Sequence, residues 1–204
     1  MIQILDYGSG NIFAINNAFN DLNLPCNIVN DPEKIDQNSK IILPGVGNFD
    51  ETALLLKSRK FWDKLDYLVT EKRTPILGIC VGMQIMAEQS EEGQEKGFGW
   101  IKGEVKKINV NNIIDKPKLP HMGWNNINVK NDDNILQNID LFEGFYFIHS
   151  YKFSPLDLNS TIATSTYGEE IPSLLRKDHI YACQFHPEKS HDNGLQLFKN
   201  FYHF

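Results

Sequence analysis

The sequence predicts an α/β fold with three layers, in which helices flank an open and mostly parallel sheet. Two patterns lead to this prediction. The first half of the chain alternates short apolar runs with segments of helical periodicity, which is typical of repeated β-α-β units. The second half is richer in alternating strands, so additional antiparallel strands are expected there. A chain of 204 residues buries roughly 70% of its unfolded surface, so we expect a single domain over residues 1–204.

The first half should contribute four buried strands. They are expected at residues 2–5, 26–29, 40–43 and 76–79. After the first strand, apolar residues recur on one face of a helix, at Ile12, Ile15, Ala18, Phe19 and Leu22. A second helical region covers much of residues 49–70, with an interruption near 57–59, and residues 83–88 also have a helical pattern.

The second half should contain shorter strands and one closing helix. The strands are expected at residues 105–110, 125–129, 145–149, 161–166, 174–175 and 180–184. The helix is expected at about 195–202. No repeat and no low-complexity linker divides the chain.

Composition excludes several classes of protein. A net charge of −6, a pI near 5.5 and the lack of a Lys/Arg cluster argue against binding to nucleic acid. The three cysteines, Cys26, Cys80 and Cys183, show no disulfide or zinc pattern, which favours a reducing compartment. No apolar stretch approaches the ~20 residues that span a bilayer, and the first residues lack a basic region. We therefore expect a cytoplasmic protein without a membrane segment.

Cys80 lies in Gly78-Ile79-Cys80-Val81-Gly82, between the strand at 76–79 and a helical segment. A side chain in so sharp a turn crowds the positions two before and two after it, which glycine relieves. A thiol at the start of a helix is also favoured as thiolate by the helix dipole. The turn therefore suggests a nucleophile, although a buried structural cysteine would fit the isolated motif equally well.

His186 and Glu188 follow directly after the apolar strand at 180–184. The imidazole can take the thiol proton and return it to a leaving amine, while the carboxylate fixes the ring tautomer. Pro187 between them restricts the backbone. Cys80, His186 and Glu188 together predict a catalytic triad.

The strand at 40–43 ends in Leu43-Pro44-Gly45-Val46-Gly47. Its glycines leave backbone N–H groups able to turn toward a ligand. Because the carboxyl ends of parallel strands frame the ligand crevice, this turn should border Cys80. The turn would then place N–H donors where an oxyanion forms during attack by Cys80. The alternative is that it is only a tight turn without a catalytic role.

At this point the sequence resembles the class I, triad-type glutamine amidotransferases, and within them the glutaminase subunits of imidazole glycerol phosphate synthase. The resemblance covers nearly the whole chain. Its motifs, as they stand here, are DYGSGN at 6–11, LPGVG at 43–47, LGICVGMQ at 77–84, PHMGWN at 120–125, HSY at 149–151 and QFHPEKS at 184–190.

The resemblance implies a glutamine amidotransferase-like fold and roles for further residues. Val46, Gly47 and the N–H of Val81 would form the oxyanion hole. Glutamine would be held by Gly47, Gln84, Glu92 and the backbone of Ser150 and Tyr151, with Glu92 pairing with the substrate ammonium. Gln84 could instead be an ordinary polar side chain, and Glu92 part of a solvated pair with Glu91.

The resemblance also implies a partner, because the chain has no second site to consume ammonia. The partner would be a (βα)8-barrel synthase that receives ammonia through a channel and makes imidazole glycerol phosphate. Asn11, Trp124 and Lys189 are the expected interface residues. We further expect residues 44–47 to rest with an N–H turned away from the site until the liganded partner reorients them.

No metal and no cofactor are expected. His121, His149 and His191 lack the spacing of metal ligands. The glycines at 8 and 10 are not followed by the third glycine of a dinucleotide-binding motif, since Phe13 stands there.

Three positions depart from the family pattern: Val81, Trp100 and the segment 169–174. They leave open a paralogous glutaminase that feeds another synthase, such as a sugar amidotransferase for surface polysaccharides. A catalytically idle interaction module and a hydrolase of another amide are further alternatives.

Overall fold

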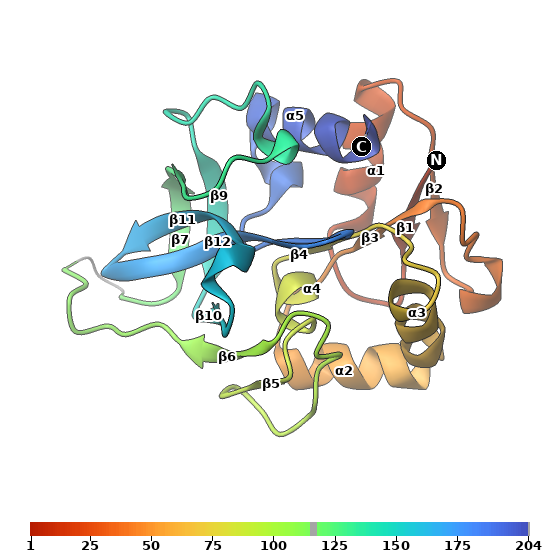
Figure 1. Cartoon of the computed structure of the whole chain (residues 1–204), viewed down its shortest axis with the longest axis horizontal. Coiled ribbons are helices and arrows are strands. Elements are labelled where there is room, and N and C mark those ends of the chain that lie inside the picture. Colours follow the sequence, from red (N-terminus) through yellow and green to blue (C-terminus); the bar gives the residue numbers. More distant parts are fainter. Residues whose placement is uncertain (115–117, 204) are drawn as a thin grey trace.

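A central eight-stranded sheet organises the chain, of which the computed structural model describes residues 1–114 and 118–203 (Figure 1). The strand order is β2-β1-β3-β4-β13-β12-β11-β8. The first five of these strands are mutually parallel, and β12, β11 and β8 continue the sheet in antiparallel pairing. This confirms the predicted fold class.

The strands of the central sheet are β1 (Ile2–Leu5), β2 (Cys26–Val29), β3 (Lys40–Leu43), β4 (Ile76–Ile79), β8 (Asn128–Val129), β11 (Thr161–Tyr167), β12 (Glu169–Lys177) and β13 (Ile180–Cys183). Two small sheets stand beside it. They consist of β10 (Tyr151–Pro155), β6 (Gly103–Lys107) and β5 (Gln89–Ser90), and of β7 (His121–Asn125) with β9 (Phe145–His149).

Helices cover both faces of the central sheet. Figure 1 shows α1 (Ile12–Asp21) and α5 (His191–His203) on one face, and α2 (Phe49–Ser58), α3 (Phe61–Thr70) and α4 (Val81–Gln84) on the other. Each face encloses its own apolar core, because the buried residues of α2 and α3 cluster apart from those of α1 and α5. Short 3-10 turns lie at Pro32–Lys34, Asn134–Leu136, Leu158–Ser160 and Pro187–Lys189. Within the described residues, no helix is long and apolar enough to cross a bilayer.

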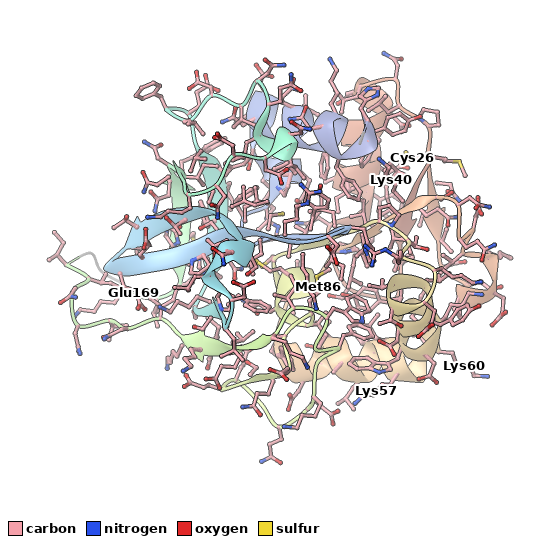
Figure 2. The ribbon with its side chains drawn as sticks, viewed as in Figure 1. Cys26, Lys40, Lys57, Lys60, Met86 and Glu169 are labelled. Atoms are coloured by element: carbon pink, nitrogen blue, oxygen red, sulfur yellow. The ribbon has the colours of Figure 1, made fainter. Side chains whose placement is uncertain are left out.

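The four strands predicted for the first half are observed with the same bounds. The helical region at 49–70 is divided into α2 and α3 at Lys60, which adopts a left-handed conformation. The predicted helical segment at 83–88 is wrong beyond Gln84. The carbonyl groups of Ile85, Met86 and Ala87 accept hydrogen bonds from the N–H groups of residues 98, 101 and 99 instead of continuing a helix. Figure 2 shows the Met86 side chain in the interior below the sheet.

The second half differs from the prediction mainly in strand bounds. The strand expected at 105–110 begins and ends a few residues earlier, as β6, and the segment expected at 125–129 is split into β7 and β8. The segment at 169–174 is part of the long strand β12 rather than a lead-in to it. Strands β5 and β10 were not predicted, and α5 begins earlier than expected.

The parallel register brings distant segments to one edge of the sheet. Cys183 of β13 is opposite Ile79 of β4, and Leu43 of β3 is opposite Gly78. The residues that follow these three strands therefore emerge side by side, as expected for the ligand crevice of an α/β sheet.

Candidate active site

Cys80 connects β4 to α4 in a strained conformation. Its φ of 55° and ψ of −110° are sparsely populated for a residue with a side chain, and such strain is concentrated at functional sites. The flanking glycines make this turn possible: a Cβ on Gly78 would lie 2.5 Å from the Gly82 carbonyl oxygen, and one on Gly82 would overlap the carbonyl oxygen of Leu43. The crowding expected from the sequence is therefore present. Cys26 lies on the outer strand β2, away from this turn (Figure 2).

His186 and Glu188 form a buried pair after β13. Nδ1 of the imidazole lies 2.7 Å from Oε1 of the carboxylate, and the two side chains are 2% and 1% exposed. Burial by itself would lower the pKa of His186, but its interactions with Cys80 and Glu188 outweigh burial and raise that pKa to about 10. Nε2 of His186 is buried and has no hydrogen-bond partner among the described residues. With Nδ1 on the carboxylate, Nε2 is the nitrogen available to the thiol and to a substrate.

Asn11 has an internal contact that sequence reasoning did not find. Its Nδ2 donates a hydrogen bond of 2.7 Å to Oε1 of Glu188, the same oxygen that binds His186. Burial alone would raise the pKa of Glu188, but the hydrogen bonds from His186 and Asn11 help to lower it. Asn11 thus helps to keep the carboxylate charged. Its predicted role at a partner interface stays a prediction.

The sulfur of Cys80 has a second polar neighbour, Gln184. Nε2 of Gln184 donates to Sγ over 3.7 Å, while its Oε1 accepts a hydrogen bond of 3.0 Å from Nε2 of Gln84. Gln184 is fully buried. Gln184 directly follows β13, and the register of β13 against β4 brings its side chain to Cys80. The sequence alone could reveal this contact only if that strand pairing were predicted correctly.

The segment after β3 is held by side chains of the first β-α turn. The hydroxyl of Tyr7 donates to the Pro44 carbonyl over 2.5 Å. The hydroxyl of Ser9 accepts the N–H of Val46 at 3.1 Å and donates to the carbonyl of Val46 at 2.9 Å. The Val46 N–H is therefore engaged by Ser9, as expected if this segment rests with an N–H turned away from the site. Val81, in contrast, is the first residue of α4, where an N–H has no acceptor within the helix.

A cavity of about 440 Å³ joins these groups. It is lined by every predicted site residue except Glu188 and Trp124. Glu188 lies behind His186, whereas Trp124 is exposed on β7 and stacks on His191 with 5.1 Å between the ring centroids. The volume suits a small, polar substrate of amino-acid size.

Glu92 and Lys189 contribute opposite charges to the lining of this cavity. Oε2 of Glu92 accepts the N–H of Phe49 at 2.9 Å, and burial is the main cause that raises the pKa of Glu92. The Lys189 ammonium lies 5.5 Å from the ring centroid of Tyr146. Among the described residues, no cluster of three or more His, Cys, Asp and Glu side chains could hold a metal ion.

The chain matches known proteins over nearly its whole length. The family model for class I glutamine amidotransferases matches residues 3–204. The imidazole glycerol phosphate synthase subunit HisH of Leptospira interrogans is 43% identical over 201 residues, which are 98% of each chain. The subunit HisH 2 of Methanococcus maripaludis is 43% identical over 205 residues, again with 98% of each chain covered.

Solved structures show the same fold at lower identity. A putative GMP synthase protein from Thermoplasma acidophilum has a TM-score of 0.70 at 23% identity, covering 98% of this chain and 91% of that one. PurLQS from Thermotoga maritima has a TM-score of 0.69 at 18% identity, covering 98% of this chain and 96% of that one. The chain therefore belongs to the class I glutamine amidotransferases, and within them to the group of HisH subunits.

Proposed function

We propose that the chain is the glutaminase subunit of an imidazole glycerol phosphate synthase. It would hydrolyse glutamine to glutamate and pass the ammonia to a synthase partner. The observation that carries the proposal is the meeting of Cys80, His186 and the 44–47 segment around one cavity, with Glu188 behind the imidazole. These are a nucleophile, a base with its orienting carboxylate, and backbone donors for an oxyanion.

Hydrolysis would proceed through a thioester. The Cys80 proton moves to Nε2 of His186, whose raised pKa favours the imidazolium, and the sulfur attacks the carboxamide carbon. The tetrahedral oxyanion is held by backbone N–H groups, and the C–N bond breaks as His186 protonates the departing ammonia. Water then attacks the thioester with His186 as base, which releases glutamate and restores the thiol.

Glutamine would be bound in the cavity, with its carboxamide at Cys80. Glu92 carries negative charge for the substrate ammonium, and Gln84, Gly47 and the backbone of Ser150 and Tyr151 surround the remaining polar groups. Both Nε2 hydrogens of Gln84 are used by Tyr151 and Gln184, so its Oε1 is the atom left for the substrate.

The acceptor would be a (βα)8-barrel synthase. The full-length relatives named as imidazole glycerol phosphate synthase subunits support this acceptor over a sugar-amidating one. Asn11, Lys189 and the exposed Trp124 are the proposed contacts with the barrel, because the first two line the cavity and the third lies on β7, which pairs with the cavity-lining strand β9. A pull-down from the source cells that recovered a sugar amidase in equal amount would contradict this assignment.

Two experiments test the glutaminase. A glutamine-mimicking electrophile should label Cys80 selectively, as mapped by mass spectrometry, and excess glutamine should protect it. Glutamate release should be slow for the chain alone and strongly stimulated by the partner with its acceptor bound, because the Val46 N–H is engaged by Ser9 at rest. Equal rates with and without the liganded partner would exclude this gating.

A further inference from the structure

A row of hydrogen bonds that the catalytic steps above do not use leads from strand β7 to the cavity. Nδ2 of Asn125 lies 3.1 Å from Nε2 of His121, and Nδ1 of His121 lies 2.9 Å from Nε2 of His149. Nδ1 of His149 in turn lies 2.8 Å from the carbonyl oxygen of Tyr151. The two imidazoles are only 3% and 5% exposed, so these contacts are largely shielded from water, although His149 also lines the cavity.

The chemistry of the end groups fixes the direction of every bond. A carbonyl oxygen only accepts, so His149 must carry its hydrogen on Nδ1. A neutral His149 then has a bare Nε2, which must accept from Nδ1–H of His121. His121 is left with a bare Nε2, which accepts from the amide of Asn125. The same amide donates its other hydrogen to the Thr166 carbonyl over 2.9 Å, which agrees with this assignment.

Packing holds both rings neutral and in place. His121 is stacked between Phe147 and Tyr167, at centroid distances of 4.8 and 4.2 Å. Burial lowers the pKa of His121 to about 4, and burial is also the main cause that lowers the pKa of His149 to about 3. Both imidazoles thus stay uncharged at neutral pH, which the row of bonds requires.

The row ends at groups of the proposed site. The Tyr151 carbonyl that accepts from His149 also accepts from Nε2 of Gln84 at 3.1 Å. Gln84 continues through Gln184 to the sulfur of Cys80. The peptide at residue 151 is therefore fixed from one side by histidine and linked on the other to the nucleophile.

We propose that His121 and His149 are positioning residues, which hold the Tyr151 peptide in the glutamine pocket through a relay of hydrogen bonds with one fixed direction. The effect of the relay on glutamine kinetics rests on the proposed glutaminase function. The hydrogen bonds of the relay themselves are a property of the free chain. Neither histidine needs to touch the reacting atoms.

The direction of the relay is tested by nuclear magnetic resonance on the full chain labelled with ¹⁵N in histidine. Both rings should show a protonated Nδ1 and a bare Nε2, unchanged between pH 6.5 and 9, well above both lowered pKa values. A protonated Nε2 on either ring would overturn the relay. This result does not depend on whether the chain hydrolyses glutamine.

The positioning role is tested by kinetics of the complex with its partner. His149→Phe keeps a ring but loses the donor to Tyr151, so the KM for glutamine should rise about tenfold while kcat changes less than about threefold. His149→Asn keeps a donor near Nδ1 and should restore most of the KM. His179, a half-buried histidine bonded to the Val69 carbonyl far from the cavity, provides the control His179→Phe. An unchanged KM in His149→Phe, or an equal rise in the control, would refute the positioning role. A wild-type complex without glutaminase activity would instead refute the proposed function.

Discussion

Ser9→Ala should activate the free chain. The Ser9 hydroxyl makes two hydrogen bonds to the peptide groups of Val46, one to its N–H and one to its carbonyl. Both bonds hold the segment after β3 in the resting arrangement, in which the Val46 N–H points at Ser9. Alanine removes both bonds without adding bulk, so the segment can turn its N–H toward the cavity more often.

The size of the effect follows from these two bonds. A neutral hydrogen bond contributes a net of about 0.5–1.5 kcal/mol, and partial exposure places each of these near the lower end. Their combined loss of about 1–2 kcal/mol changes the ratio of resting to turned segment by roughly 5- to 30-fold. Tyr7 still holds the Pro44 carbonyl, so the segment stays attached at its start.

The assay is glutamate release by the chain alone, compared with release by the complex with liganded partner. Ser9→Ala should raise the resting rate roughly 5- to 30-fold, leave the stimulated rate unchanged, and so reduce the stimulation by the same factor. Ser9→Thr keeps the hydroxyl and should behave as wild type. Ser58→Ala removes a hydroxyl that donates to the Leu55 carbonyl within α2 and serves as a matched control. A resting rate that is unchanged or lower in Ser9→Ala would refute the reasoning.

Three further predictions concern the triad and the interface. Asn11→Leu removes a donor to the carboxylate of Glu188, so it should lower the free energy of unfolding by about 1.5–3 kcal/mol at pH 7. Because the pKa of Glu188 is lowered in the fold, this difference should vanish as the pH falls through that pKa, as measured by urea unfolding at several pH values. Cys80→Ala removes a group that raises the pKa of His186, so the ring should titrate below the wild-type value of about 10 in a proton NMR titration, and an unchanged pKa would contradict this influence of Cys80. Trp124→Ala should weaken stimulation by the partner about tenfold but leave the resting glutaminase rate unchanged, because its ring is exposed outside the cavity.

The raised pKa of His186 also has a consequence for stability. A group whose pKa is higher in the fold than in the unfolded chain stabilises the fold below its unfolded pKa. That stabilisation is lost as the pH rises from about 6.5, the unperturbed value, through about 10. His186 therefore stabilises the folded chain fully below about pH 6.5 and less and less as the pH rises toward about 10.

The parallel strands could be predicted because their signal is local. A run such as Ile2–Leu5 is buried on both faces, so nearly every residue is apolar whatever its neighbours are. Strand β10 could not be predicted in the same way, because Tyr151–Pro155 is an edge segment whose pairing with β6 depends on the tertiary fold. The helix after Cys80 ends early for a similar reason: a distant loop binds the carbonyl groups that would continue it.

The residues of the candidate site also differ in how local their sequence signals are. Cys80 and the glycines at 45 and 47 carry local signals of turn geometry, and His186 follows an apolar strand with Glu188 two residues later, so the sequence could indicate them. Asn11 and Gln184 carry no such signal, because each is an ordinary amide until the sheet register directs it at Glu188 or at the sulfur.

Many amide and imidazole side chains are buried around the triad, and most of them are hydrogen-bonded to one another. Each buried donor or acceptor left without a partner costs about 1–3 kcal/mol, so such groups persist only where they complete one another. The row from Asn125 to the Tyr151 carbonyl is complete at every link, whereas Nε2 of His186 and Oε2 of Glu188 are buried without partners among the described residues. The satisfied atoms lie where the site must be rigid. Of the two unsatisfied atoms, Nε2 of His186 faces the cavity, where a proton must move during catalysis. The free-energy penalty of its missing hydrogen bond is removed only when the thiol and the substrate bind to it.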